Sequence, residues 1–304
     1  MKRFFSHIYK YFRWYVLAGL TIIVILVVSA YLHENRHGIL KFVVLDIGQG
    51  DSLFIESPTG VQVLVDGGPN KALMKEIPRV IPWYDRQIDM IVVTNPDKDH
   101  YEGFLPLMKK YKVGKILEPG TNSPTDTYAF LEKEIIEKKI TKVLATRGQR
   151  IDLGAGAYLE ILFPDRDISG LSSNDGSIVM RLVYGETSVM LQGDSTSRIE
   201  DYMLTLGTTT LKSTILKAGH HGSRTSSESE YVTAVAPKWT VISSGAENSY
   251  GHPHKETLET MEKLKIPTFD TCNNGRLVFE SDGKNFVLKN KNPKLAVVGC
   301  KIKA

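Results

Sequence analysis

The sequence contains little cysteine: only Cys272 and Cys300 occur among its 304 residues. Neither has another Cys or a His at the short spacing typical of structural zinc sites, so a cysteine-based zinc module is excluded. Outside the cytoplasm the two could form a disulfide. As unpaired thiols they would instead act as small apolar residues, and the sequence leaves both possibilities open.

The sequence also lacks an excess of positive charge over most of its length. The net charge is +4, from 38 Lys and Arg against 34 Asp and Glu. Residues 1–37 hold five of the basic residues and one of the acidic residues, which leaves 33 of each sign in residues 38–304. This excludes an overall basic field that would attract nucleic acid, but it does not exclude a local basic patch.

Long hydrophobic runs are absent except for one near the N-terminus. Residues 16–32 carry no charge and are apolar apart from Thr21 and Ser29, and basic residues precede them. This pattern predicts a single membrane-spanning helix with a cytoplasmic N-terminus and the following domain outside the cytoplasm. Cleavage after Val28-Ser29-Ala30, which would release a secreted protein, is the alternative. We therefore expect a basic tip, anchor and linker over 1–37, a domain over 38–290, and a tail of unknown role over 291–304.

Internal repeats and low-complexity tracts are absent as well, and the remaining pattern is that of an α/β domain. Short Val-, Ile- and Leu-rich runs alternate with Gly, Pro and Asp. Two similar halves, each with hairpins and strand–helix units, predict two sheets packed face to face with helices outside. The predicted strands are 40–47, 52–56, 62–66, 89–94, 114–118, 142–145, 154–163, 177–184, 188–192, 213–217, 239–244, 276–280 and 285–289. The predicted helices are 102–111, 126–138, 196–206 and 255–264.

The histidines of the domain are confined to three short motifs. These are Asn95-Pro96-Asp97-Lys98-Asp99-His100, Gly219-His220-His221-Gly222-Ser223 and Gly251-His252-Pro253-His254. Each motif follows a predicted strand, as does Asp194, so their side chains can converge on one sheet edge. Imidazole and carboxylate groups are the usual ligands of zinc, manganese and iron. Taken singly, Asp97 could form an Asx-turn, Asp194 could cap a helix, and His220 or His252 could be a hydrogen-bonding loop residue.

Several stretches resemble a metallo-β-lactamase-fold domain, most closely the subgroup at the C-terminus of ComEC, the DNA-uptake channel protein of competent bacteria. The resemblance covers about residues 40–280. It is carried by Val44–Ser52 with Asp51, Leu64–Gly68 with Asp66, Asp97–His100, Asn174–Leu182, Leu191–Asp194, Leu216–Ser223 and Tyr250–Pro253. It implies an αββα sandwich, the metallo-β-lactamase fold, with the site at the sheet edge.

The resemblance also implies a ligand set. Asp99, His100, Asp194 and one of the 220–221 pair, for which we choose His221, would hold one divalent ion. Asp97 and Asp194 would hold a second ion, with oxygen-rich ligation that favours manganese or magnesium over zinc. The family's loop has His where this chain has Asn95, and no His occurs between His100 and His220. We thus expect one or two ions, manganese or zinc.

The resemblance further implies a metal-dependent hydrolase, with phosphodiesters and especially DNA as substrate. Asp99 and His252 are the expected catalytic residues. Asp66 would support the metal loop, and His220 would lie behind the ligands or face the substrate. Lys98, Lys217 and Arg224 flank the motifs and are either phosphate contacts or ordinary solvated surface. A hydrolase of another ester, amide or lactam, and a binding module that lost turnover with Asn95, are the alternatives. Protein partners are not indicated.

Overall fold

The computed structural model describes residues 2–34, 38–121, 123–206, 211–246 and 248–300. It contains two compact units, residues 1–37 and 38–304. The first is one helix, α1 (Lys2–Glu34). Within it, Lys10–Ser29 has a mean hydropathy of 2.1 over 20 residues, long and apolar enough to cross a membrane. The helix therefore fits a single-pass anchor, and a signal sequence would have the same features.

The second unit contains two mixed β-sheets. In spatial order the first sheet comprises β15 (Phe286–Leu288), β14 (Leu277–Ser281), β1 (Leu40–Val44), β2 (Leu53–Glu56), β3 (Gln62–Val65), β4 (Gln87–Val92), β5 (Lys112–Glu118) and β6 (Thr141–Leu144). The second comprises β13 (Thr268–Asp270), β12 (Trp239–Ile242), β11 (Ile215–Lys217), β10 (Thr187–Leu191), β9 (Val179–Tyr184), β8 (Ala157–Phe163) and β7 (Arg150–Gly154).

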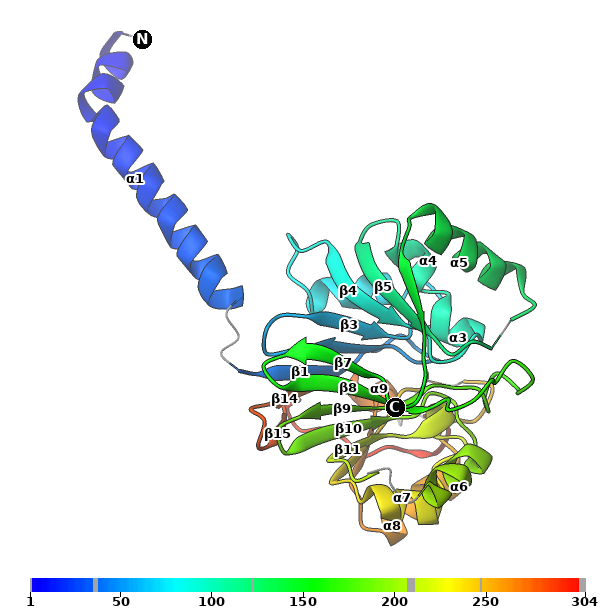
Figure 1. Cartoon of the computed structure of the whole chain (residues 1–304). Helices are drawn as coiled ribbons and strands as arrows, with labels where there is room; N and C mark the ends of the chain where they lie inside the picture. The colour runs from blue at the N-terminus through cyan, green and yellow to red at the C-terminus, as the bar shows by residue number, and fades with distance from the viewer. Residues whose placement is uncertain (1, 35–37, 122, 207–210, 247, 301–304) are drawn as a thin grey trace. The chain divides into compact units, whose positions relative to one another are not determined.

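The helices cover the outer faces of the sheets, which makes a four-layer αββα sandwich (Figure 1). Those against the first sheet are α2 (Leu73–Glu76), a 3₁₀ turn (Ile77–Arg79), α3 (Lys98–Tyr101), α4 (Phe104–Leu107) and α5 (Asp126–Glu137). The others are α6 (Ser197–Thr205), the 3₁₀ turn η2 (Gly219–Gly222), α7 (Ser229–Val235), α8 (Lys255–Lys263), α9 (Thr271–Asn274) and η3 (Val298–Cys300). The predicted fold class is confirmed.

Alternation of side chains along the strands builds the core between the sheets. Phe42, Ile55 and Val63 of the first sheet are buried in one cluster with Leu159 and Met180 of the second. Neighbouring residues on the same strands point outward and pack under the helices, because successive strand residues face opposite sides. Strands buried on both faces therefore appear in the sequence as continuous apolar runs.

The predicted helix over 102–111 is wrong. The chain forms α3 and α4 instead, because tertiary hydrogen bonds replace the helical ladder between them. The backbone N–H of Gly103 donates to Gly68 O at 2.9 Å, and Asp99 O accepts from the N–H of Asp51 at 3.2 Å. The break leaves α3 as a single turn shortly after β4.

Short elements account for the other differences. The predicted strand 154–163 begins later, at Ala157, because residues 154–156 all have positive φ and form the turn between β7 and β8. Strands β7 and β13 and helix α7 were not predicted. Each has only three to seven residues, too short for periodicity to distinguish from loop.

Parallel pairing positions the polar loops. Strands β10, β11 and β12 are parallel neighbours, with Leu191 opposite Lys217 and Lys217 opposite Val241. In the first sheet β3 and β4 are parallel as well. The carboxyl ends of parallel strands lie at one edge of a sheet, so the loops after β4, β10, β11 and β12 can approach one another there.

Candidate metal centre

Four of the predicted ligands come together at this edge. Asp99 and His100 lie on α3 after β4, Asp194 follows β10, and His221 lies in η2 after β11. One ligand atom from each of the four lies within 4.8 Å of the others. Residues up to 122 positions apart thus form a single group of two carboxylates and two imidazoles, a ligand set suited to a divalent cation.

Three of the atoms that face one another in this group lack hydrogen bonds. His100 Nε2, His221 Nε2 and Asp194 Oδ1 are buried and have no hydrogen-bond partner among the described residues. His100 Nε2 lies 3.1 Å from Asp194 Oδ2, and His221 Nε2 lies 3.3 Å from Asp99 Oδ2. An unsatisfied buried polar atom costs about 1–3 kcal/mol. Convergence of three such atoms on one point is the arrangement that a bound cation would satisfy.

Two further aspartates fix the orientation of the imidazoles. Asp66 Oδ2 lies 2.9 Å from His100 Nδ1, and Asp51 Oδ1 lies 3.0 Å from His221 Nδ1. Asp66 also accepts hydrogen bonds from the N–H and Oγ of Thr94, at 2.8 and 2.6 Å. Each carboxylate holds the Nδ1 proton of its ring and turns Nε2 toward the group, as is usual behind metal-bound histidines.

Asp51 has a second partner, Lys217, that sequence reasoning placed wrongly. Lys217 Nζ donates to Asp51 Oδ2, and both side chains are only 1–2% exposed. Burial opposes ionisation of Asp51, but Lys217 and His221 hold the pKa of Asp51 below its ordinary value. Lys217 is therefore neither solvated surface nor a phosphate contact. Its position at the end of β11, buried between sheets, could not be read from local sequence.

The negative charge of the group favours positive charge at its centre. Burial lowers the pKa of His100 and His221, but Asp194 and the aspartate behind each ring raise it well above the ordinary value. Burial also opposes the charge on Asp99, yet the neighbouring imidazoles of His221 and His100 lower its pKa to about 2. Without a cation, protons would have to supply the balancing charge.

His220 and His252 lie beside the group rather than in it. His220 Nε2 is 3.7 Å from Asp194 Oδ2, and the His220 ring centroid is 5.4 Å from that of His252. His252 is buried, with Nδ1 3.4 Å from Gln49 Nε2. Burial, followed by the charges of His221 and His220, lowers the pKa of His252 to about 3. The ring is thus neutral at physiological pH.

The structure does not bring Asp97 into the group. Asp97 occupies the N-cap position of α3, and its Oδ2 accepts from Ser173 Oγ at 2.8 Å. Asn95 is fully buried and bonds to Asn174 and Ser177. Nor does Asp194 cap the next helix, since Thr196 is the N-cap of α6. The second metal position, for which we expected Asp97 and Asp194, is therefore not assembled in the same way as the first.

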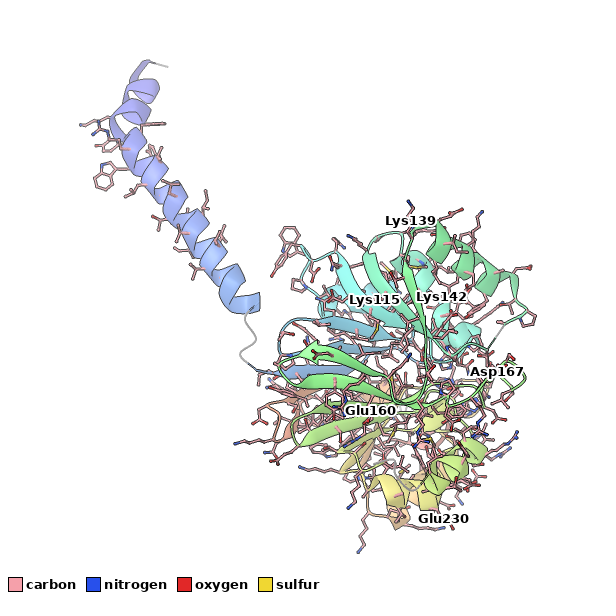
Figure 2. The ribbon with its side chains drawn as sticks, viewed as in Figure 1. Lys115, Lys139, Lys142, Glu160, Asp167 and Glu230 are labelled. Carbon is pink, nitrogen blue, oxygen red and sulfur yellow. A yellow bond between two sulfur atoms is a disulfide. The ribbon has the colours of Figure 1, made fainter. Side chains whose placement is uncertain are left out.

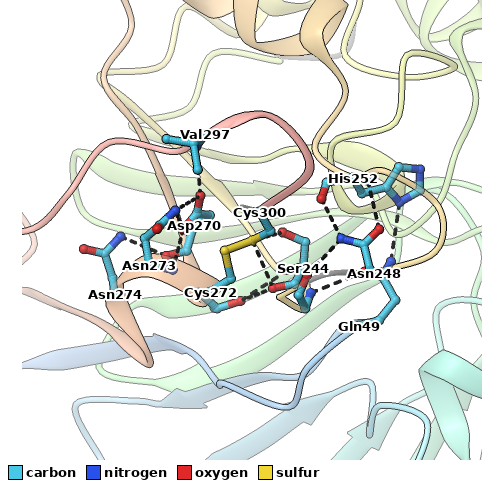
Figure 3. The surroundings of a disulfide bond; sticks show 12 residues. Gln49, Ser244, Asn248, His252, Asp270, Cys272, Asn273, Asn274, Val297 and Cys300 are labelled. Carbon is cyan, nitrogen blue, oxygen red and sulfur yellow. Dashed lines mark hydrogen bonds between the residues drawn. A yellow bond between two sulfur atoms is a disulfide. The ribbon is translucent and has the colours of Figure 1, made fainter. Parts of the chain in front are cut away.

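Cys272 and Cys300 form a disulfide, which settles the question left open by the sequence (Figure 3). It joins α9 to the C-terminal segment, which also bonds to the domain through Val297 N–H to Asp270 Oδ2 and Gly299 N–H to Pro253 O. Cys300 Sγ lies 3.4 Å from Ser244 Oγ. The described part of the tail thus packs beside the loop that carries His252.

Comparisons with known proteins agree with this geometry. Residues 45–245 match the family described as the metallo-beta-lactamase superfamily. ComE operon protein 3 of Bacillus subtilis (strain 168) is 27% identical over 259 residues, which cover 77% of this chain and 32% of that protein. Recombination protein 2 of Haemophilus influenzae is 26% identical over 239 residues, covering 77% of this chain and 28% of that protein. The chain therefore spans about a third of the length of these relatives.

Among solved structures, a mutant of the CmlA beta-hydroxylase matches with a TM-score of 0.51 at 15% identity, over 79% of this chain and 53% of that chain. At this identity the likeness concerns the fold alone. The family match, by contrast, includes the strands and loops that supply Asp99, His100 and Asp194. Since it covers more than half of the sequence, the chain belongs to the metallo-beta-lactamase superfamily.

Proposed function

We propose that residues 38–304 form a metal-dependent phosphodiesterase, with DNA as the preferred substrate. The observation that carries the proposal is the group of Asp99, His100, Asp194 and His221, in which three facing atoms, one each from His100, His221 and Asp194, are buried without hydrogen bonds. These four side chains would hold the ion. When bound, a divalent ion lowers the pKa of a water molecule and neutralises charge on a phosphoryl oxygen.

The chain's own residues would supply the remaining functions. The Asp99 side chain is 32% exposed, while those of the other three ligands are at most 4% exposed, so Asp99 lies on the open side of the group. Because Asp99 is ionised at neutral pH, it can orient an attacking water molecule or accept a proton from it. His252 receives a hydrogen bond at Nδ1, because the Gln49 amide nitrogen can only donate. The single N–H of the neutral ring is then at Nε2, where it can donate a hydrogen bond to a substrate oxygen.

The names of the relatives support DNA as substrate. Similar proteins include a recombination protein and the competence protein ComA of Neisseria gonorrhoeae, which is 27% identical over 236 residues. Because this chain matches only part of each, the activity of the whole relatives does not transfer directly. A hydrolase of another ester, amide or lactam would use the same group.

The exposed charge of the domain is mixed. Figure 2 labels Lys115, Lys139 and Lys142 on the side of the first sheet, and Glu160, Asp167 and Glu230 on the side of the second.

The first test is nicking of supercoiled plasmid by the purified 38–304 segment. We expect nicking only with added Mn²⁺, Zn²⁺ or Mg²⁺, and loss of nicking with EDTA. The segment has no net charge, so few phosphates are neutralised and the rate should fall only modestly with salt. A plot of the logarithm of the nicking rate against the logarithm of the salt concentration should therefore be shallow. A slope as steep as that of a protein contacting about six or more phosphates would contradict this expectation. Metal-dependent turnover of small esters without nicking would favour another hydrolase, and bound metal without turnover would favour a binding module.

We also propose that α1 anchors the chain with the domain outside the cytoplasm. Four basic residues precede the apolar part of α1: Lys2, Arg3, Lys10 and Arg13. After it, the opposite charges of Glu34 and Arg36 cancel. Basic residues remain on the cytoplasmic side of single spans. Protease added to cells stripped of any wall should therefore digest the domain. Protection equal to that of a cytoplasmic protein would contradict this orientation, and recovery of the domain in the medium would indicate cleavage.

A further inference from the structure

We infer that the centre binds one divalent ion per chain, and that a hydrogen-bonded cluster built on Asn95 closes the place where a second ion would sit. The inference rests on the proposed metal-dependent function and specifies its stoichiometry. The closing cluster consists of Asn95, Asp97, Ser173, Asn174 and Ser177. It adjoins the metal group through the Asp194 N–H, which donates to Ser177 Oγ at 3.3 Å.

Both polar atoms of the Asn95 side chain already have hydrogen-bond partners. Its Nδ2 donates to Asn174 Oδ1 at 2.9 Å and to Ser177 Oγ at 3.3 Å. Its Oδ1 accepts from the Asp97 N–H at 2.9 Å. An amide nitrogen with two hydrogens is a donor only and presents positive partial charge. The side chain is 0% exposed and thus cannot turn to solvent.

Ser177 and one carboxylate oxygen of Asp97 are engaged in hydrogen bonds as well. Ser177 is fully buried, and its Oγ, besides meeting Asn95 and Asp194, lies 3.4 Å from Ser173 O. Ser173 Oγ donates a hydrogen bond to Asp97 Oδ2. The one carboxylate of the closing cluster is therefore held by a hydroxyl and is not part of the group of four ligands.

The contrast between the two clusters decides the stoichiometry. In the metal group, three buried atoms face a common point without hydrogen bonds. In the closing cluster, the polar atoms of Asn95 and Ser177 bond to one another, to Asn174 Oδ1 or to the backbone. Binding of a cation is most favourable where the ligand atoms have no hydrogen bonds. It is much less favourable where the cation must first break existing hydrogen bonds. One position thus favours an ion and the other opposes it.

The test measures ions per chain in the full-length protein in detergent micelles. Metal is stripped, Mn²⁺ is added back and excess is removed, and bound manganese is counted by mass spectrometry and examined by electron paramagnetic resonance. Wild type should hold one ion with the spectrum of an isolated Mn²⁺. Asn95→Asp, which replaces the donor amide by a carboxylate of the same shape, should hold two, with the spectrum of a coupled pair.

Asn70→Asp is the matched control. It makes the same chemical change on an exposed loop, where Asn70 Oδ1 accepts from the Ala72 N–H as an aspartate oxygen also would. It should hold one ion. Two ions in wild type would overturn the inference but leave the proposed function standing. A folded Asn95→Asp protein that still holds one ion would overturn the role of Asn95. No bound ion in wild type would overturn both the inference and the proposed function.

Discussion

Replacement of Asp194 by alanine is expected to abolish metal binding and to lower turnover by about 10³-fold or more. Both Asp194 oxygens face the imidazoles: Oδ2 lies 3.1 Å from His100 Nε2, and Oδ1 lies 3.5 Å from His221 Nε2. No other carboxylate in the described site lies between both rings in this way. The change removes the ligand that joins the two halves of the group.

The fold should survive this substitution. Asp194 lies in the loop after β10, and its backbone N–H, which bonds to Ser177, is retained in the alanine variant. Metal content and circular dichroism of the apo protein should be measured together with plasmid nicking. His220→Ala is the control for metal content, because His220 Nε2 lies 3.7 Å from Asp194 and outside the group. Full metal content in Asp194→Ala, or loss of metal in His220→Ala with retention in His221→Ala, would refute the ligand assignment.

The second large effect concerns stability and the buried pair of Asp51 and Lys217. Asp51→Asn is expected to lower the free energy of unfolding of the apo domain by about 3–5 kcal/mol, the usual cost of leaving one partner of a buried ion pair uncompensated. The substitution keeps an oxygen that can accept from His221 Nδ1, so the loss reports mainly on the charge of Lys217. Urea unfolding of the 38–304 segment in EDTA measures it.

A double variant separates this charge effect from general damage. Asp51→Asn combined with Lys217→Met removes both charges, and it should recover more than half of the lost stability. The exposed pair of Lys255 and Glu259, 3.1 Å apart on α8, is the comparison. Glu259→Ala should cost at most about 0.5 kcal/mol, as is typical of exposed i,i+4 pairs. An equally small effect of Asp51→Asn would show that Lys217 is not held as a buried charge.

The amino-acid sequence by itself determined the layered α/β fold and the family. Apolar runs bounded by Gly, Pro and Asp located most of the strands, because a strand buried on both faces must be apolar throughout. The loop motifs also pointed to Asp99, His100, Asp194 and His221, because polar residues at strand ends are the ones that a sheet edge can gather. Their roles as ligands remain predictions, which the metal measurements above address.

The tertiary structure alone decided how the neighbouring residues are used. Whether Lys217 is solvated or buried depends on Asp51, 166 residues away. Whether Asp97 and Asn95 serve a second ion depends on Ser173, Asn174 and Ser177, which follow a different strand. The pairing of Cys272 with Cys300 likewise depends on where the C-terminal segment packs. Local sequence encodes periodicity and turns, whereas burial and hydrogen-bond partners arise only when distant segments meet.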